Sequence, residues 1–220
     1  MRFIAIAAML MLAARAAAAE PVLEIAKDTA LEPKKTYGKL VVTASNVTID
    51  GRGAWIVGAK DGNPKTFKGI GIEAKGVSSV TLKNVNVRGF ETGLRIQDAK
   101  HWTIENCTFS DNFHDPEFGW GENGRRGGIL LVNVRLSEIK NCYANRVWDG
   151  CTLVNCDGNS LFNNDFSRCS NTCLKLWHSS RNAVMENKLD YGLRIKPGEV
   201  HARDSTSVLI ETGSNDNTFT

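Results

Sequence analysis

Basic side chains that could act on an acidic sugar gather in the last third of the chain. Lys175 and His178 lie close together, and His201 and Arg203 follow in a later segment. Removing the proton beside a sugar carboxylate needs a base, and the enolate-like intermediate needs a cation to hold its charge. Neighbouring cations can lower a lysine pKa towards neutrality, which would suit it to act as the base. We therefore take these four residues as candidate catalytic residues, the alternative being charges scattered over a solvated surface.

Further candidates could bind the sugar without reacting with it. Arg194 and Lys196 would add positive charge beside the same group. The indole of Trp177 is a flat surface on which a sugar ring could stack. His114 and Trp120 belong to an earlier segment that could reach the same ligand.

That earlier segment is also acidic. Asp111, Asp115 and Glu117, with Glu122 nearby, could supply oxygen ligands for Ca²⁺. Two of these carboxylates could instead act as the acid and base of a glycosidase. A third interpretation is a loop closed by ion pairs to the arginines that follow, with no cofactor at all.

A short repeated phrase gives the first evidence of how these residues are positioned. An apolar residue, any residue and then Asn recur with the asparagines at positions 84, 106, 141 and 163, in steps of 22, 35 and 22 residues. Asparagine tolerates left-handed backbone and its amide can bond a stacked copy of itself. The phrase predicts a tight turn in each repeat and a ladder of asparagines along the stack.

A second phrase recurs in phase with the first and alternates with a period of two. It occurs at residues 71–74, 93–96, 128–131, 150–153 and 173–176. This alternation is typical of strands and not of helices. Each repeat is therefore predicted to hold three short strands, which can bury an apolar face only when successive coils stack about 4.8 Å apart. The sequence predicts an all-β parallel β-helix over residues 20–220. A leucine-rich repeat has a similar period, but its leucine pattern is absent.

Residues 45–51, Ser-Asn-Val-Thr-Ile-Asp-Gly, followed by the asparagine coils, resemble the pectin-lyase-like superfamily of right-handed β-helix proteins. That superfamily includes polysaccharide lyases, glycoside hydrolases, uronate epimerases, phage tailspikes and proteins without known activity. The resemblance implies a saccharide cleft along the sheet of first strands. It also implies similarity between the basic cluster and the Lys/Arg machinery of one class of alginate lyases, without a matching motif around it.

Three insertions follow a third strand and precede a first strand, at residues 60–68, 113–126 and 190–205. They are predicted to stand on one corner, beside the sheet of first strands, and long loops on one face of a repeat protein favour a binding site there. We expect the site in the groove between the second and third insertions. The outward positions near Trp177 include Leu130, Val132 and Val154, so the second insertion could instead fold over that face.

The N-terminus has the features of an export signal. Arg2, an apolar run and three alanines before residue 20 predict a cleaved signal peptide over residues 1–19 and a secreted, periplasmic or extracellular protein. No later stretch is a candidate for membrane insertion. Removal of Arg2 and Arg15 with the signal takes the net charge from +3 to +1, which is too small to favour a nucleic-acid partner. The six cysteines are predicted to be mostly buried thiols rather than bridges. The last residues begin a coil that breaks off, so we expect the chain to continue beyond residue 220.

Two functions stay open at this point. The first is a secreted carbohydrate-active protein, a lyase or epimerase on an acidic polysaccharide. The second is a non-catalytic surface or carbohydrate-binding module in which a rigid solenoid displays loops. Convergence of the charged candidates in one groove would favour the first.

Overall fold

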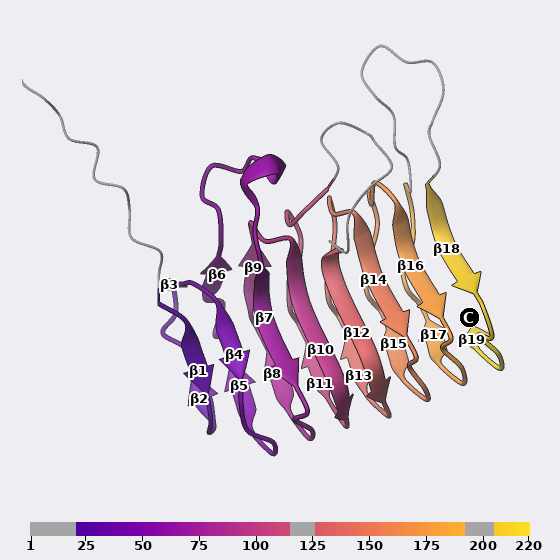
Figure 1. The fold of residues 1–220 in the computed structure, drawn as a ribbon, viewed down its shortest axis with the longest axis horizontal. Helices are drawn as coiled ribbons and strands as arrows, with labels where there is room; N and C mark the ends of the chain where they lie inside the picture. Colours follow the sequence, from indigo (N-terminus) through magenta and orange to yellow (C-terminus); the bar gives the residue numbers. More distant parts are fainter. Residues whose placement is uncertain (1–20, 115–125, 192–204) are drawn as a thin grey trace, which may run out of the picture.

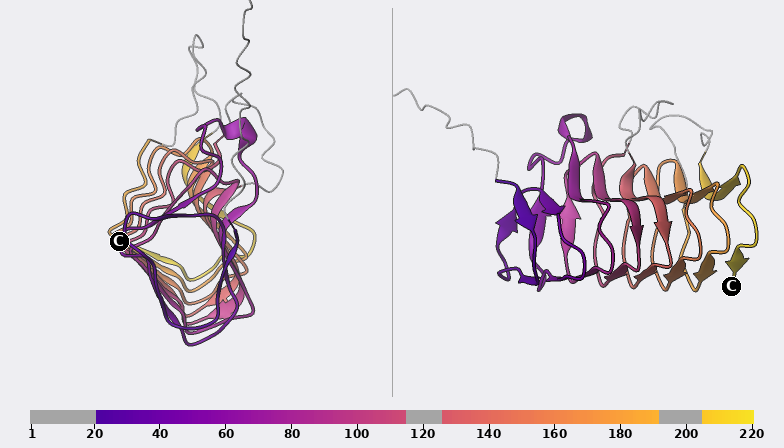
Figure 2. Two further views of the ribbon diagram at one scale, coloured as in Figure 1. Left: turned by 90° about the vertical axis from the view of Figure 1, so that its left-hand side faces the viewer. Right: turned by 60° about the horizontal axis from the view of Figure 1, so that its bottom comes forward.

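The computed structural model describes residues 21–114, 126–191 and 205–220, which wind as a stack of parallel coils (Figure 1). Strands one coil apart in sequence lie side by side and pair in parallel, so each sheet gains a strand with every coil. Viewed along the stack, the coils superimpose around one shared interior (Figure 2). The predicted parallel β-helix is confirmed.

The first sheet is eight-stranded and carries the candidate site. In spatial order it contains β1 (Leu23–Ile25), β4 (Leu40–Val42), β7 (Ile70–Lys75), β10 (Thr92–Lys100), β12 (Gly127–Arg135), β14 (Asp149–Val154), β16 (Thr172–Trp177) and β18 (Thr206–Glu211).

The other two sheets complete each coil. The second sheet contains β2 (Thr29–Ala30), β5 (Thr48–Asp50), β8 (Thr81–Lys83), β11 (Thr103–Glu105), β13 (Glu138–Lys140), β15 (Ser160–Phe162), β17 (Ala183–Met185) and β19 (Thr218–Phe219). The third contains β3 (Thr36–Tyr37), β6 (Trp55–Val57) and β9 (Asn86–Arg88). Single parallel bridges through Thr108, Tyr143, Asp165 and Lys188 continue it.

The register explains why the second phrase repeats. Ile72, Leu94, Ile129, Cys151 and Leu174 pair in that order across the first sheet, and all five are fully buried. A one-residue slip would turn this column outwards, so the apolar pattern fixes the register. The core is one continuous apolar stack along the solenoid.

The asparagine phrase marks a left-handed turn, as predicted. Asn84, Asn106, Asn141 and Asn163 all have φ between 50° and 57°. Their side chains do not form a continuous buried ladder, however, because Asn106 and Asn163 are exposed. Nδ2 of Asn163 donates to Oδ1 of Asn141 at 2.7 Å, and Asn84 pairs with Asp50.

The buried ladder is built one residue later, and on a second corner. Oδ1 of Asn164 accepts from the backbone N–H of Cys142, and Oδ1 of Asn187 accepts from Asn164 in the same way. Asn159 repeats the arrangement with Asn182 on the other corner. These amides satisfy backbone groups that the bends leave without a strand partner.

The cysteines are stacked thiols. All six are free and buried. Cys107 and Cys142 sit one coil apart, and Sγ of Cys107 is 3.7 Å from the carbonyl oxygen of Leu82. The preference for thiols over bridges is confirmed.

The insertions leave the same corner of the coil. Residues 60–68 join β6 to β7 and contain one turn of 3-10 helix, η1 (Pro64–Thr66), capped by Asn63. The ends of the other two insertions lead into β12 and β18, which places them on the corner predicted for them. Within the described ranges, no helix is long and apolar enough to cross a membrane.

Candidate functional site

The outer face of the first sheet carries two columns of side chains, in the register that the sequence predicted. One column runs through Glu73, Arg95, Leu130, Thr152 and Lys175, and the other through Lys75, Gln97, Val132, Val154 and Trp177. Strand β18 extends them by Leu209 and Glu211. The middle of the face is apolar and partly buried, whereas charged groups gather at its two ends.

Lys175 occupies the C-terminal end of this face and is held by two neighbours. Its Nζ lies 3.1 Å from Oε2 of Glu211 and 5.3 Å from the centre of the Trp177 ring. The side chain is only 15% exposed. The charged group in direct contact with Nζ of Lys175 is therefore a carboxylate and not a second cation. Lys175 is thus suited to bind anionic or hydroxyl groups of a ligand as a cation.

Trp177 and His178 end the same strand and form a flat aromatic surface. Their ring centres are 6.3 Å apart with an interplanar angle of 22°. Trp177 is 40% exposed, which leaves part of the indole available to a ligand. His178 follows in left-handed backbone, with φ at 48°, and this turn places its ring beside the indole instead of on the opposite face of the strand.

A buried carboxylate, Asp149, lies at the start of the central strand β14. Its Oδ1 accepts from Nδ2 of Asn171 at 2.7 Å, and its Oδ2 accepts from the hydroxyl of Thr152 at 3.2 Å. Nη1 of Arg126 is 3.6 Å from the same Oδ2. Burial raises the pKa of the Asp149 carboxyl, while the hydrogen bond from Asn171 and the charge of Arg126 act in the opposite direction. Because the side chain is fully buried, Asp149 positions its neighbours rather than touching a ligand.

Sequence reasoning missed Asp149. It pairs with Gly127 and Thr172 in the sheet, so an acid stands where the neighbouring coils have small or hydroxyl side chains. An acid at this repeat position, where the neighbouring coils have none, was the feature of the sequence that could have identified Asp149.

The other end of the face carries a second charged group. Both Lys39 and Arg95 contact the carboxylate of Glu73. Partial burial opposes ionisation of Glu73, but the hydrogen bonds from Lys39 and Arg95 outweigh it and lower its pKa. Arg95 is three coils and Glu73 four coils away from Lys175 along the sheet, so this group and Lys175 do not form one centre.

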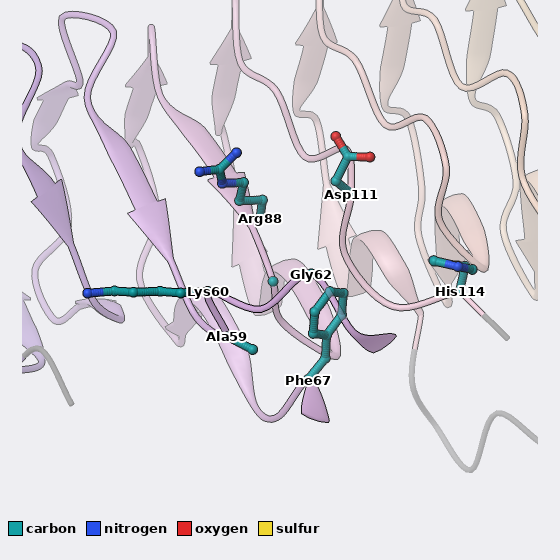
Figure 3. Close-up of a pocket in the computed structure, with 8 residues that line it drawn as sticks. Ala59, Lys60, Gly62, Phe67, Arg88, Asp111 and His114 are labelled. Atoms are coloured by element: carbon teal, nitrogen blue, oxygen red, sulfur yellow. The ribbon is translucent and has the colours of Figure 1, made fainter. Parts of the chain in front are cut away.

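Asp111 and His114 belong to a different place, a pocket of about 300 Å³ at the corner that bears the insertions (Figure 3). Its lining residues are Ala59, Lys60, Gly62, Phe67, Arg88, Gly89, Asp111 and His114. Both carboxylate oxygens of Asp111 bind Arg146, at 2.5 and 2.7 Å. The arginine therefore occupies the oxygens that a Ca²⁺ site would need.

The structure brings together only some of the predicted residues. Lys175, Trp177 and His178 form one cluster on the first sheet. Asp115, Glu117, Trp120, Glu122, Arg194, Lys196, His201 and Arg203 lie outside the described residues. Among the residues that are described, no three His, Cys, Asp or Glu side chains are grouped as metal ligands.

Comparison with known proteins agrees with the architecture. The family model for a right-handed β-helix region matches residues 69–220. The chain belongs to this family. Its coils are therefore right-handed as well as parallel. No curated protein matches the sequence.

Two of the solved structures that resemble this β-helix protein show how remote the likeness is. A candidate glycosyl hydrolase from Parabacteroides merdae ATCC 43184 is 15% identical, with a TM-score of 0.48, over 81% of this chain and 85% of that one. QnrB1, a plasmid-mediated fluoroquinolone resistance protein, is 11% identical, with a TM-score of 0.22, over 86% of this chain and 90% of that one. At such scores neither structure bears on the chemistry of this chain.

Proposed function

We propose that this β-helix protein is carbohydrate-active and binds an acidic polysaccharide along the outer face of its first sheet. The observation that carries the proposal is the exposed Trp177 ring beside the Lys175–Glu211 ion pair. An indole face can stack on the C–H face of a sugar ring, and the adjacent charged pair can bind its hydroxyl and carboxylate groups. Aromatic and charged groups side by side on a rigid sheet suit an extended polar ligand.

The stacked strands support a repeating ligand. Adjacent coils are about 4.8 Å apart, so a chain lying along the sheet meets equivalent outward positions at a regular spacing. Arg95 and Lys175 belong to one such column and stand at opposite ends of its apolar middle. Two cationic ends separated by an apolar surface would favour a polysaccharide that carries carboxylates at intervals.

The chemistry that we favour is uronate elimination or epimerisation. A base removes the C5 proton and a cation stabilises the charge that develops on the carboxylate. In elimination the C4–O bond then breaks, the leaving oxygen takes up a proton, and an unsaturated sugar remains. In epimerisation a proton returns to C5 from the other face. The contact with Glu211 supports the role of cation for Lys175, and the adjacent imidazole of His178 is then the base we favour among the described residues.

Export is part of the same proposal. A signal peptide over residues 1–19 would bring the protein to extracellular or periplasmic polysaccharide. Sequencing the N-terminus of the mature protein from the host envelope or medium tests it, and a retained Met1 would contradict it.

The decisive experiment measures binding and turnover on alginate, pectate and glycosaminoglycans. Isothermal titration reports binding, and absorbance of the unsaturated uronate reports elimination, while proton NMR reports epimerisation. Trp177→Ala and Lys175→Met should each weaken binding about tenfold or more, equivalent to about 1.4 kcal/mol. The melting temperature should change little, because an exposed ring and a single ion pair with a partly exposed carboxylate contribute little stability.

Matched controls are available on the third face. Tyr143 is 52% exposed and Lys188 is also exposed, so Tyr143→Ala and Lys188→Met remove the same kinds of group elsewhere. Equal losses from the control variants, or no binding to any acidic glycan by the folded protein, would refute the proposal.

A non-catalytic binding module is the second candidate. Two observations support it: Lys175 is paired with Glu211, and Asp149 is buried. In the described part of the face, therefore, no acid and base lie opposite each other across a ligand site. Binding that depends on Trp177, with no product from any glycan, would identify this function.

A further inference from the structure

The pocket at the insertion corner combines an apolar floor with a charged rim. Phe67 is 4% exposed and packs with Phe113, Trp148 and Ala59 in a small cluster separate from the main core. In Figure 3, Lys60 and Arg88 lie on one side of Phe67 and His114 lies on the other. Gly62 and Gly89 also line the pocket, so two of its lining positions present backbone without a side chain.

The charges on the rim are not balanced. Asp111 is the carboxylate of the lining, and it is already bound at both oxygens by Arg146. Lys60 and Arg88 form no ion pair with any of the described residues, and both are exposed. Cζ of Arg88 lies 4.6 Å from the centre of the Trp55 ring, a contact that uses none of the carboxylate-binding capacity of the guanidinium. The rim therefore offers two cations and favours an anionic ligand.

The size of the pocket restricts the ligand further. Small-molecule sites occupy roughly 300–1,000 Å³, and this one, at about 300 Å³, lies at the lower end. A single sugar ring suits that volume better than an oligosaccharide. Its C–H face would lie on the edge of the Phe67 cluster while its polar groups meet the charged rim.

We propose that this pocket binds one sugar acid, with its carboxylate directed to Lys60 and Arg88. The choice of a sugar acid rests on the proposed function, whereas the preference for a compact anion rests on the pocket alone. The pocket is distinct from the Trp177 face, because its residues come from the segment after β6, from the end of β9 and from the segment between β11 and β12, and none of them belongs to the first sheet. It would bind a chain end or a released monosaccharide.

The test titrates the full chain with galacturonate, with neutral galactose and with inorganic phosphate. Saturation-transfer difference NMR and calorimetry measure the binding of each ligand. Galacturonate should bind at least about tenfold more tightly than galactose. Lys60→Met and Arg88→Met should each weaken galacturonate binding about tenfold, since each removes one charge-assisted contact. Lys100→Met, which removes an exposed lysine on β10 away from the pocket, is the matched control.

Trp177→Ala separates this pocket from the polysaccharide face. We expect it to weaken polysaccharide binding and to leave galacturonate binding unchanged. No galacturonate binding, equal binding of galactose, an equal loss in the Lys100 variant, or a loss in Trp177→Ala would each overturn the pocket proposal. Tighter binding of phosphate than of galacturonate would overturn the sugar acid as ligand. Loss of the proposed polysaccharide function alone would leave the pocket result intact.

Discussion

The buried amide at position 164 should be among the most sensitive polar positions of the solenoid. Oδ1 of Asn164 accepts from the backbone N–H of Cys142 at 2.9 Å, and Nδ2 donates to the carbonyl of Ile139 at 2.9 Å. All three residues are buried. Asn164→Ala would remove both contacts, together with the bond that Nδ2 donates to Oδ1 of Asn187, and would leave two backbone groups of the preceding coil without this partner.

The expected cost follows from those two groups. A buried donor or acceptor that loses its partner costs about 1–3 kcal/mol. Two such groups give a loss of roughly 2–6 kcal/mol in the free energy of unfolding. The backbone N–H of Asn164 still bonds Asn187, so the turn itself is retained and the loss should not exceed this range.

Urea unfolding of the full chain, followed by circular dichroism and tryptophan fluorescence, measures the loss. Asn106 provides the control, because it is exposed, has φ at 54° and makes no side-chain hydrogen bond to the described residues. Asn106→Ala should cost only about 1–2 kcal/mol for its left-handed backbone. Asn106→Gly should stay within about 1 kcal/mol of the wild type. If Asn164→Ala stays within about 0.5 kcal/mol of the wild type, the buried amides are not what stabilises the turns.

Three further predictions concern the buried acid, the thiols and the closest backbone approach. Because burial raises the pKa of Asp149, the folded state favours the protonated form more than the unfolded chain does. The stability of the wild type relative to Asp149→Asn should therefore be greatest near pH 4 and fall as the pH rises, measured by urea unfolding from pH 4 to 7. The six thiols are buried and should react only slowly with a thiol reagent in the native state, and burial raises the pKa of Cys156 to about 11; Cys173 should be the first to react before unfolding, because a hydrogen bond with Cys169 lowers its pKa, and rapid native-state labelling of all six would contradict the packing. Gly128→Ala would place a Cβ 2.1 Å from the carbonyl oxygen of Gly150 and should lower the free energy of unfolding by about 3 kcal/mol or more, by the same urea assay.

Much of the fold was predictable because a solenoid repeats local rules. The apolar residues of each coil must lie directly beside those of the next coil. The alternation around Leu94 and Ile129 therefore predicts both the strands and their parallel register. The left-handed turn at Asn106 was predictable for the same reason, since asparagine tolerates that backbone. Which asparagines would be buried was not predictable, because Asn163 and Asn164 are adjacent and only the direction of the turn separates the exposed amide from the buried one.

The candidate site was predictable only in part. The outward columns followed from the strand period, and they correctly placed Lys175 and Trp177 on the same face. The sequence did not reveal that Glu211 would pair with Lys175, because these residues are 36 positions apart and one coil closes that gap. His114 was grouped with the first-sheet groove and Asp111 with a separate candidate Ca²⁺ site, but both residues line one pocket at the corner that bears the insertions.

The sequence by itself determined the repeat, the three-strand coil, the parallel stacking and the side of the sheet on which each residue stands. Those properties depend on the period of apolar and turn residues, which is local to each coil. Tertiary structure decided which charges neutralise one another, which carboxylate is buried and which corner encloses a pocket. Such properties depend on side chains from different coils meeting within a few ångströms, and electrostatic and hydrogen-bond energies change steeply over that distance.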